Sequence, residues 1–359
     1  MSYNYQRIII KIGSNVFTQK DGLPDFDRIK HLVEQIAEIK NQGKEVILVS
    51  SGAVASGRGL ISVSDKYDAV AARQLLASIG QVKLINTYAN LFEQHGFLCS
   101  QVLVTKEDFR DRVHYLNMKN CLEILLHHGV VPVVNENDVV SVTELMFTDN
   151  DELAGLIASM LNAQALIVLT NVDGIYNGDP KLPESNIIEE VIGTNNDFSS
   201  FVSSGRSQFG RGGMITKSTM AQKVAQLGIE VHIANGTKED VLLKVLNNTI
   251  PHTRFIPNKS KSGKKKWIAH SGNFATGMVK LNEGARLALT SAKASSLLPI
   301  GITEICTEFK KGDIIKLTDE NDQQIGLGIA EYGSEKAKEM IGKKNQKPLV
   351  HYDYLYLEF

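Results

Sequence analysis

The stretch RIIIKIGSN, residues 7–15, sets the pattern for the first 250 residues of the chain. It opens with an apolar run that does not alternate with polar residues, which is typical of a strand covered on both faces. Lys11 stands near the end of this run, and Gly13 begins a polar loop. Ligands of open parallel sheets bind beyond the carboxyl ends of the strands. The stretch therefore predicts a buried strand whose end presents a cation to a ligand.

Further apolar runs follow, and patterns typical of amphipathic helices precede them. The first helical pattern covers residues 23–42, and Gly43 is its expected stop signal. Pro132 interrupts one run and is expected near the start of that strand, because proline cannot donate to the ladder. Runs that do not alternate need helices on both faces of the sheet. The predicted fold class is α/β, a three-layer α/β/α sandwich with a mainly parallel central sheet, its other strands lying at residues 45–49, 97–104, 130–134, 165–169 and 229–233.

The pattern changes near residue 250. The stretch PNKSKSGKKK, residues 257–266, is polar and basic, which predicts an exposed linker. The segments after it are short and are separated by turn signals at 282–284, 311–313 and 319–322, with strands expected at 314–317 and 324–329 and a helix at 334–341. The predicted organisation is a first domain at 1–256, the linker, and a small β-rich domain at 267–359.

Composition excludes several classes of protein. The 359 residues include 39 Lys and Arg and 40 Asp and Glu, so the net charge of −1 does not favour nucleic acid or membranes. The three cysteines are scattered without CxxC spacing, which excludes a disulfide framework and indicates a reducing compartment. Neither a signal peptide nor an apolar run of membrane-spanning length is present, so the expected location is the cytoplasm.

Two glycine-containing loops follow the first two strands. The first begins at Gly13, and the second is SSGAVASGRG at residues 50–59. Glycine lets backbone N–H groups approach an anion, and the N-terminus of the following helix favours negative charge. Glycines after strands are also ordinary turns, so either loop alone is ambiguous. Two such loops together with Lys11 favour an anion site.

Two acidic clusters and a second lysine add to this pattern. NEND at 135–138 and TDND at 148–151 bracket a segment, 139–147, that is expected to form a strand. Helix capping explains one of the residues in the second cluster, and the remainder could hold the charged groups of an amino acid or orient lysines. RGGMITK at 211–217 places a glycine pair before a helix that carries Lys217. It lacks the spacing of a Walker A loop.

Motifs of other enzyme classes are missing from the sequence. No GxGxxG follows a strand, no G-x-S-x-G is present, and the histidines lack metal-ligand spacing. A dinucleotide-binding fold, a serine hydrolase and a protein-bound metal site are therefore not expected.

The motifs together resemble those of the amino-acid kinase family, and the resemblance covers nearly the whole chain. The matching stretches are KIGSN at 11–15, SSGAVASG at 50–57, NEND at 135–138, DND at 149–151 and GGMITK at 212–217. The residues from 267 onward, including ASSLLPIG at 294–301, resemble a PUA domain. Among family members, this combination is similar to those that phosphorylate the side-chain carboxylate of L-glutamate with ATP, the first step of proline biosynthesis. The tail separates the chain from acetylglutamate and uridylate kinases and from aspartokinases.

The resemblance implies a role for each motif residue. Lys11 and Lys217 would contact the transferring phosphate, and Asp151 would orient both lysines. Glutamate would be held by Ser51, Asp138 and Asn150. The residues expected to bind ATP are Lys11, Gly13, Thr170, Asn171, Arg211, Gly212, Gly213, Met214, Ile215, Thr216 and Lys217.

The chain departs from the family pattern at three positions. The family commonly has Asp at position 171, Gly at 148 and Thr at 211, where this chain has Asn171, Thr148 and Arg211. These departures concern the nucleotide side more than the glutamate side.

The chemistry agrees with these roles. Phosphoryl transfer needs in-line positioning and positive charge on the phosphate oxygens. A carboxylate is already a nucleophile at neutral pH, so Asp151 is expected to orient the lysines and not to remove a proton. Mg²⁺ is expected to bind chiefly through the ATP phosphates.

Two alternatives stay open at this point. The chain could be another carboxylate or carbamate kinase of the same fold, or an RNA-binding protein with a vestigial kinase domain, since PUA domains commonly bind RNA and Lys264–Lys266 lie beside this one. The resemblance also implies a homo-oligomer, either dimer or tetramer, feedback inhibition by proline, and transient contact with the reductase that consumes glutamyl 5-phosphate; no membrane partner is expected. Glu144 lies in the region expected to sense an effector, or is simply an exposed strand residue.

Overall fold

A computed structural model divides the chain into two compact units, Met1–Ser260 and Lys261–Phe359. The structure describes residues 3–64, 66–141, 147, 149–179, 182–193, 213–257, 263–270, 272, 275–291 and 295–357. The division between the units falls within the stretch 257–266 that the sequence analysis predicted to be a linker. The first unit carries the motifs at residues 11–217.

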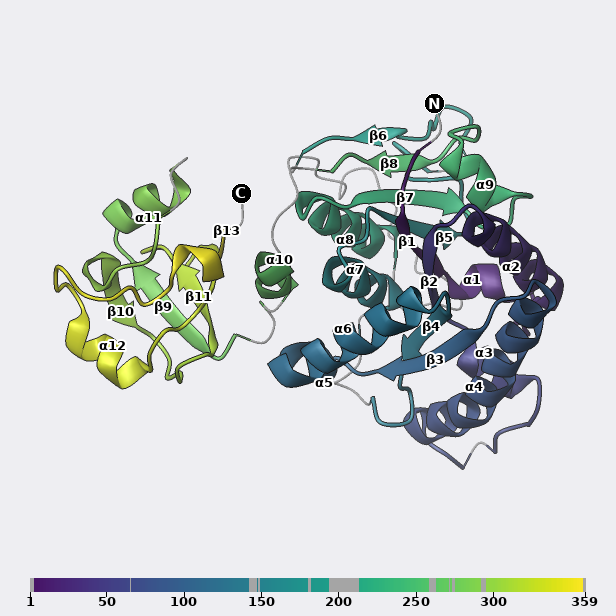
Figure 1. Ribbon diagram of the computed structural model, residues 1–359, viewed down its shortest axis with the longest axis horizontal. Coiled ribbons are helices and arrows are strands. Elements are labelled where there is room, and N and C mark those ends of the chain that lie inside the picture. Colours follow the sequence, from purple (N-terminus) through teal and green to yellow (C-terminus); the bar gives the residue numbers. More distant parts are fainter. Residues whose placement is uncertain are drawn as a thin grey trace. The chain divides into compact units, whose positions relative to one another are not determined.

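The first unit is built around one eight-stranded sheet with the order β3-β4-β2-β1-β5-β7-β8-β6 (Figure 1). Neighbouring strands run parallel except β7 and β8, which are antiparallel. The predicted mainly parallel sheet is therefore confirmed. The strands are β1 (Arg7–Ile12), β2 (Glu45–Ser50), β3 (Cys99–Val104), β4 (Val131–Glu136), β5 (Ala165–Thr170), β6 (Glu190–Val191), β7 (Glu230–Asn235) and β8 (Thr253–Phe255).

Helices cover both faces of this sheet, which makes the predicted three-layer sandwich (Figure 1). The helices are α1 (Ser14–Phe17), α2 (Phe26–Asn41), α3 (Ala53–Arg58), α4 (Ala69–Gln94), α5 (Glu107–Arg110), α6 (Arg112–His127), α7 (Asn150–Met160), α8 (Met214–Gln226) and α9 (Val241–Leu246). On one face α2 packs against β2, α4 and α9. On the other face α7 packs against β1, β2, β4 and β5, and α8 packs against β7 and β8.

Alternation along β1 decides which layer receives Lys11. Ile8, Ile10 and Ile12 belong to the core that β1 forms with α2, α4 and α9. Successive side chains of a strand point to opposite faces, so Lys11 points toward the face covered by α7. Because β1 lies between β2 and β5, the lysine is shielded from water and is only 4% exposed.

The region around β4 shows one confirmed and one wrong expectation. Pro132 is the second residue of β4, and pairing with β2 begins only at Val133, so the missing N–H is not needed there. The strand expected at 139–147 is wrong in its described part. Residues 138–140 form a turn in which the N–H groups of Val140 and Ser141 donate to the carbonyl of Asn137. The turn overrides the strand preference of two adjacent valines.

The second unit holds a five-stranded sheet with the order β10-β9-β11-β12-β13. Its strands are β9 (Gly277–Leu281), β10 (Ile302–Ile305), β11 (Ile314–Thr318), β12 (Gln324–Ile329) and β13 (Leu355–Leu357). Its helices are α10 (Gly263–His270), α11 (Glu283–Thr290) and α12 (Ser334–Met340), with 3₁₀ turns η4 (Pro299–Gly301) and η5 (Tyr352–Tyr354). Strands β11 and β12 and helix α12 occur where the sequence predicted them. The predicted β-rich module is therefore confirmed.

Two expectations for this unit need correction. The turn signal at 282–284 is a helix start, because the Asn282 side chain caps α11 by accepting from the Ala285 N–H at 2.8 Å. The exposed linker is also shorter than predicted, since residues 263–266 already belong to α10, which packs against β12 and β13. Lys266 and Trp267 are buried, because the apolar residues after the lysines give this helix a face to bury.

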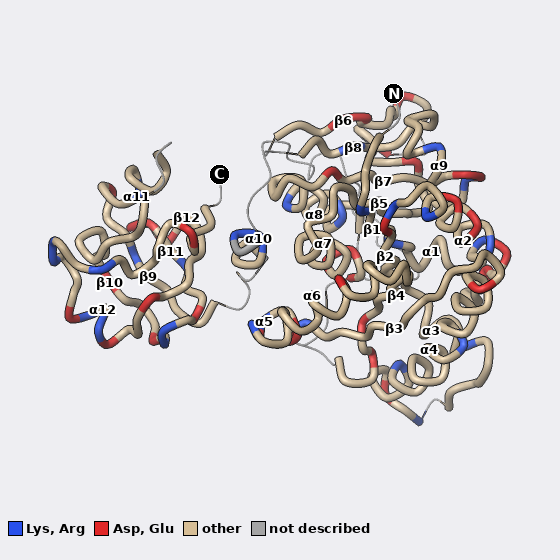
Figure 2. The backbone as a smooth tube through the Cα atoms, viewed as in Figure 1, with Lys and Arg blue, Asp and Glu red and all other residues tan. Residues whose placement is uncertain are grey.

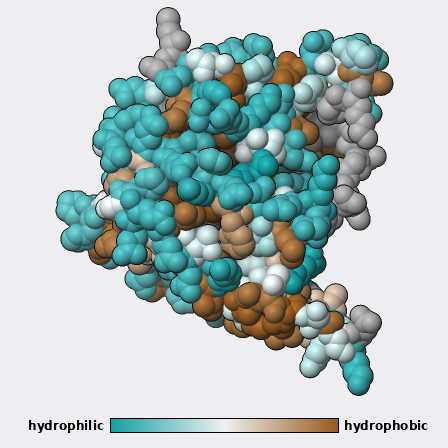
Figure 3. Space-filling model, turned by 90° about the vertical axis from the view of Figure 1, so that its right-hand side faces the viewer, coloured by the Kyte–Doolittle hydropathy of each residue, from teal (hydrophilic) through white to brown (hydrophobic). Residues whose placement is uncertain are grey.

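Residues of both signs of charge are interspersed along the backbone in both units (Figure 2). Figure 3 shows that the face on the right-hand side of Figure 1 is mostly hydrophilic, with its most extended hydrophobic area low on it. Exposed apolar residues at and before α4 include Leu60, Val70 and Val82. Among the described helices, none is both long enough and apolar enough to cross a membrane.

Candidate active site

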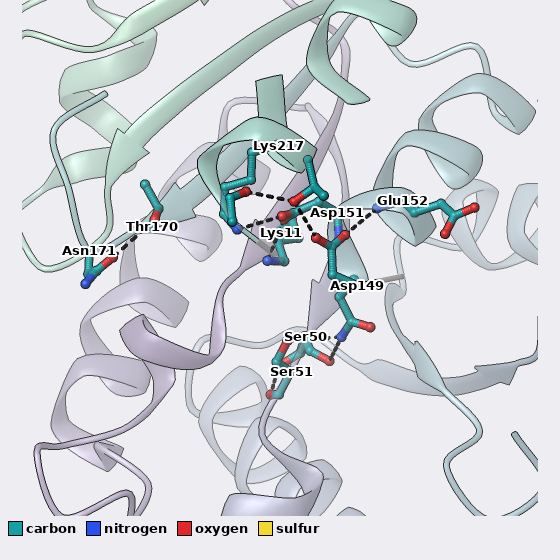
Figure 4. A network of polar contacts seen from close by, with 12 residues as sticks. Lys11, Ser50, Ser51, Asp149, Asp151, Glu152, Thr170, Asn171 and Lys217 are labelled. Carbon is teal, nitrogen blue, oxygen red and sulfur yellow. Dashed lines mark hydrogen bonds and ion pairs between the residues drawn. The ribbon is translucent and has the colours of Figure 1, made fainter. Parts of the chain in front are cut away.

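A buried aspartate holds two lysines that are 206 positions apart in the chain (217 minus 11). The Asp151 carboxylate forms an ion pair with the Lys11 ammonium at 2.5 Å and another with the Lys217 ammonium at 2.9 Å (Figure 4). Asp151 is fully buried, and the side chains of Lys11 and Lys217 are 5% and 13% exposed. The structure therefore brings together the three residues that the sequence analysis expected to be catalytic.

The starts of two helices position this trio. Asp149 caps α7, because its carboxylate accepts from the backbone N–H groups of Asp151 at 2.9 Å and Glu152 at 3.1 Å. Gly213 precedes α8, and the Thr216 hydroxyl donates to its carbonyl at 2.7 Å and lies 3.4 Å from the Asp149 carboxylate. The first turns of the two helices are thus linked. Of the acidic cluster at 149–151, Asp149 is the cap, and Asp151 is left to face the lysines.

Electrostatics keep Asp151 ionised. Burial acts to raise its pKa, but the charges and hydrogen bonds of Lys11 and Lys217 outweigh burial and hold the pKa below its ordinary value. Burial and the charge of Asp151 raise the pKa of Asp149. The trio Lys11–Asp151–Lys217 therefore carries one net positive charge in a site from which water is largely excluded. Such a site suits an anion whose charge must be stabilised.

Glycines in the first two loops allow close packing. The Gly13 N–H donates to the Leu169 carbonyl at 3.1 Å, and a Cβ on Gly13 would lie 2.9 Å from that oxygen and 3.6 Å from the Lys11 ammonium. Gly52 has a φ of +115°, a conformation that favours glycine, and a side chain there would overlap the Phe17 ring. A side chain on Gly57 would overlap the Leu76 carbonyl, so this glycine brings α3 close to α4.

A chain of amides leads away from the lysines. The Asn150 amide donates to the Ser51 hydroxyl at 3.0 Å and to the Asn135 side-chain oxygen at 3.1 Å. The Asn135 amide in turn donates to Gln81 of α4 at 3.1 Å. Asn150 follows the cap of α7, and Asn135 and Ser51 lie at the carboxyl ends of β4 and β2. Two of the predicted glutamate-binding residues are therefore in direct contact.

The third predicted glutamate-binding residue lies beyond these amides, in an ion pair. Arg73 of α4 donates to one oxygen of the Asp138 carboxylate through Nε at 3.0 Å and also through Nη2. Nη2 lies 3.6 Å from the Glu136 carboxylate. The other oxygen of Glu136 accepts from the Phe147 N–H at 2.9 Å. Burial raises the pKa of Glu136 to about 7, with the Asp138 charge adding to the shift.

The residues expected on the nucleotide side lie around the ends of β5 and α8. Thr170 ends β5, and its hydroxyl lies 3.4 Å from the Asn171 side-chain oxygen. Figure 4 places these two residues on a different side of the lysine pair from Ser50 and Ser51. Gly213, Met214, Ile215, Thr216 and Lys217 form the entry to α8 and its first turn. Glu144, Thr148, Arg211 and Gly212 lie outside the described residues.

Sequence reasoning missed the residues that α4 contributes. Arg73 and Gln81 fall on the buried stripe of α4 formed by Leu76, Ala77 and Gly80. Their spacing of three, four, seven and eight residues places them on one helical face. The available signal was that two polar residues lie on an otherwise apolar stripe. The sequence did not indicate which residues they would contact.

No group of three or more His, Cys, Asp or Glu among the described residues is arranged to hold a metal ion.

Comparisons with known proteins agree with this geometry. The family model described as "Amino acid kinase family" matches residues 6–235, and the PUA domain model matches residues 277–352. The chain is 52% identical to a protein of Bacteroides thetaiotaomicron named "Glutamate 5-kinase", and the match covers 100% of both chains. It is 49% identical to a protein of Chlorobaculum tepidum with the same name, over 98% of each chain.

A solved structure of carbamate kinase from Giardia lamblia bound to AMP-PNP is similar in fold. Its TM-score is 0.50 at 20% identity, and the match covers 70% of this chain and 99% of that one. Together with the two family models, these relatives show that the chain belongs to the amino acid kinase family and carries a PUA domain after its kinase domain.

Proposed function

We propose that this chain transfers the terminal phosphoryl group of ATP to the side-chain carboxylate of L-glutamate. The product is L-glutamyl 5-phosphate, and the reaction is the first step of proline biosynthesis. The observation that carries the proposal is the buried trio Lys11–Asp151–Lys217 beside the polar chain of Ser51, Asn150 and Asn135. Relatives named "Glutamate 5-kinase" at 52% and 49% identity support the choice of glutamate over other acids.

The lysines stabilise the negative charge of the phosphoryl group in the transition state of its transfer. An oxygen of the glutamate side chain attacks the terminal phosphorus, and the bond from that phosphorus to the oxygen bridging to ADP breaks. Negative charge spreads over the transferring group, and two ammonium groups in a dry site neutralise it. Asp151 holds both lysines in place and needs no proton, because the attacking carboxylate is already ionised.

The two substrates approach the trio from different sides. Glutamate is held by Ser51, Asn150 and Asp138. ATP lies along Thr170, Asn171 and the start of α8 from Gly213 to Lys217, and Gly13 leaves room beside Lys11 for the phosphates. Mg²⁺ is bound chiefly through the ATP phosphates, where it neutralises further charge.

Other properties follow from the family resemblance. Inhibition by proline, assembly into dimers or tetramers, and transient contact with the reductase that consumes the product are parts of the same proposal. RNA binding by the PUA domain and the cytoplasmic location stay predictions.

Trapping the acyl phosphate with hydroxylamine tests the proposal. The purified chain is incubated with ATP, Mg²⁺ and hydroxylamine, and with glutamate, aspartate, N-acetylglutamate or carbamate as the acid, with and without proline. We expect ADP release and hydroxamate from glutamate, reduced by proline. If another acid reacts faster than glutamate, that acid is the substrate and the proposed glutamate specificity is rejected. If the chain retains RNA in a salt-sensitive way and does not turn over ATP, the proposed kinase function is rejected in favour of RNA binding.

A further inference from the structure

Two histidines take part in a buried chain of hydrogen bonds that the proposed mechanism does not use. The Tyr5 hydroxyl lies 3.0 Å from Nε2 of His232, and Nδ1 of His232 lies 3.0 Å from Nε2 of His252. Nδ1 of His252 lies 2.9 Å from the backbone carbonyl oxygen of Ile250. All three side chains are buried, and His232 is fully so. The chain ties the residues before β1 to β7 and to the residue before β8.

This chain lies on the opposite face of the sheet from Lys11. His232 is in register with Ile167 of β5, and Ile167 is in register with Ile10 of β1. Residues in register on neighbouring strands point to the same face. Because Ile10 and Ile167 belong to the core under α2 and α9, His232 points toward those helices, whereas Lys11 points toward α7.

The Ile250 carbonyl fixes the position of each proton in the chain. A carbonyl oxygen can only accept, so Nδ1 of His252 carries its hydrogen. A neutral imidazole has one donor and one acceptor nitrogen, so Nε2 of His252 accepts from the Nδ1–H of His232. Nε2 of His232 then accepts from the Tyr5 hydroxyl. If both rings take up a second proton, two N–H groups face each other across 3.0 Å with no acceptor between them.

The charged groups beside His232 oppose its protonation. Its Nε2 lies 3.9 Å from the Glu230 carboxylate, but that carboxylate already accepts from Nε of Arg254. Nη1 of Arg254 also donates to Glu190 of β6 at 3.1 Å. Burial lowers the pKa of His232 well below its ordinary value, and the charges of His252 and Arg254 lower it further.

The second ring is kept neutral in the same way. Burial lowers the pKa of His252, and the charge of Arg254 acts in the same direction. The Ile250 carbonyl and the carboxylates of Glu189 and Glu230 act in the opposite direction without reversing the shift.

The other titratable groups near the pair do not change this balance. Burial raises the pKa of both Tyr3 and Tyr5, so their hydroxyls stay neutral. On α9, the Lys244 ammonium donates to the Glu239 carbonyl at 2.9 Å and lies 3.9 Å from Asp240. β5 has no ionisable side chain, and α8 packs on the other face of β7. These neighbours add no charge that would pair with a protonated histidine.

We propose that Tyr5, His232 and His252 form an acid-sensitive latch that fastens residues 3–6 to β7 and β8. At neutral pH the hydrogen bonds are complete and the latch is closed. As pH falls, the histidines take up protons, their N–H groups conflict, and residues 3–6 detach from the sheet. Because β1 begins directly after these residues, the strand that carries Lys11 then loses its support at its start. The inference does not depend on which acid the chain phosphorylates.

Two further contacts of residues 3–6 pass through the same side chains. The Tyr3 ring stacks on Tyr5 with 5.4 Å between the ring centroids, and its centroid lies 5.1 Å from that of His232. The Tyr3 N–H donates to the Leu246 carbonyl at 2.9 Å. Detachment of the tyrosine rings therefore exposes this amide hydrogen to water, which makes its exchange a measure of opening.

The closed latch predicts the direction of the pH dependence. Both pKa values are lowered in the closed state, whereas each histidine in the open state has its ordinary value of 6.5. Opening therefore takes up protons below pH 6.5 and is independent of pH above it. Between pH 6.5 and pH 5 the opening constant should rise about 15-fold if one histidine responds and about 250-fold if both do.

Isotope labelling of the histidine ring nitrogens tests the closed state. Long-range proton–nitrogen NMR distinguishes the two neutral tautomers and the charged form of each ring. At pH 7 we expect His232 and His252 to be neutral with the hydrogen on Nδ1. The variants His232→Gln and His252→Gln assign the signals. A hydrogen on Nε2 of either ring would overturn the proton arrangement on which the latch depends.

Amide hydrogen exchange of the full chain tests the opening. Deuterium uptake by residues 3–6 is followed by mass spectrometry from pH 7.5 to pH 5 and corrected for the intrinsic exchange rate. Uptake at the start of β4 is the reference for unfolding of the whole unit, since the Val131 N–H donates to the Leu98 carbonyl at 2.8 Å. Wild type is compared with His232→Gln, and His31→Gln, at an exposed position of α2, is the matched control.

We expect uptake by residues 3–6 of wild type to rise by the stated factors below pH 6.5 while the reference stays constant. His232→Gln keeps a donor and an acceptor and cannot be protonated, so its rise should not exceed the about 15-fold of a single histidine. His31→Gln should follow wild type. Tyr5→Phe removes the hydroxyl donor and should raise uptake about 5- to 150-fold already at pH 7.5, which decides the question if His232→Gln does not fold.

Three results of the exchange experiment would overturn the latch. Uptake by residues 3–6 that does not depend on pH would show that the histidines do not control opening. A rise in parallel with the reference would show unfolding of the whole unit and not of this segment. An undiminished rise in His232→Gln would show that other groups take up the protons.

Discussion

The two ends of the proposed site consist of different kinds of side chain. The phosphate end, Lys11, Asp151 and Lys217, is a buried set of full charges in direct contact. The acceptor end, Ser51, Asn135, Asn150, Asp138 and Arg73, consists of neutral amides and a hydroxyl that lead to a partly exposed ion pair. Buried charges stabilise charge that develops in the transition state, whereas hydrogen bonds to the ground state hold the substrate. The difference predicts that the phosphate end controls kcat and the acceptor end controls KM.

Asp151→Asn should have the largest effect. It removes the anion that both lysines share, so each ammonium group loses its fixed position and two buried cations repel each other. We expect kcat to fall more than about 10³-fold, since each misplaced donor costs roughly 10²–10³-fold. Loss of one partner of a buried ion pair should also lower the free energy of unfolding by about 3–5 kcal/mol. Hydroxamate formation and urea unfolding measure the two effects, and a variant with normal kcat would reject the orienting role.

Lys217→Ala should come next, with kcat reduced roughly 10²–10³-fold, because one transition-state donor is lost. The KM for glutamate should change little, since this lysine belongs to the phosphate end. Lys30→Ala, at an exposed position of α2, is the matched control and should behave as wild type. Near-normal turnover of Lys217→Ala, or a loss confined to KM, would break the comparison between the two ends.

Glu136→Gln should reveal a pH dependence that belongs to the acceptor end. The pKa of Glu136 is about 7 in the folded chain against an ordinary 4.5, so between these values the folded state holds a proton that the unfolded state has lost. Stability from this group therefore falls as pH rises from 4.5 to 7, by up to about 3 kcal/mol at about 1.4 kcal/mol per pH unit, and is constant outside this window.

Glu136→Gln should remove that slope. Urea unfolding from pH 4.5 to 8 measures it by far-UV circular dichroism, because the single tryptophan, Trp267, lies in the second unit. Parallel curves for wild type and variant would contradict the shifted pKa. The phosphate end should add no such slope in this window, since the pKa of Asp151 is lowered.

Asn150→Ala should have the smallest effect of the four. It removes the donor to Ser51 and Asn135, and an unpaired polar group costs about 1–3 kcal/mol, which corresponds to roughly 5- to 150-fold. We expect the loss in the KM for glutamate, with kcat within about threefold. Titration of glutamate in the hydroxamate assay separates the two constants. A loss in kcat alone would place Asn150 with the phosphate end.

Much of the fold was predictable because its strands are covered on both faces. Unbroken apolar runs cannot be confused with exposed loops, so β1, β2, β4, β5 and β7 occur where the sequence indicated them. Segments with weaker patterns were wrong, including the expected strand at 139–147 and the turn at 282–284. In both cases a short-range contact decided the local structure: the backbone carbonyl of Asn137 accepts two N–H groups of a turn, and the Asn282 side chain caps α11.

The site was predictable in part for a related reason. Lys11, Asp151 and Lys217 stand in motifs at the ends of strands and starts of helices, where a parallel sheet gathers its ligands. Arg73 and Gln81 stand in no motif, and Glu136 lies within NEND but was given no role. Their importance depends on which face of α4 meets the ends of β4 and the turn after it, and that contact joins residues 54 to 65 positions apart.

The amino-acid sequence by itself determined the layered architecture, the order of the strands' apolar runs and the identity of the charges near their ends, because periodicity and short motifs act over a few residues. The family resemblance also implied that Asp151 orients both lysines, and the tertiary structure supplies the two ion pairs. Only the tertiary structure decided that an arginine on a long helix pairs with an aspartate after a distant strand. Distances of 2.5–3.0 Å between such groups depend on how helices pack on the sheet, and this packing is a property of the whole core.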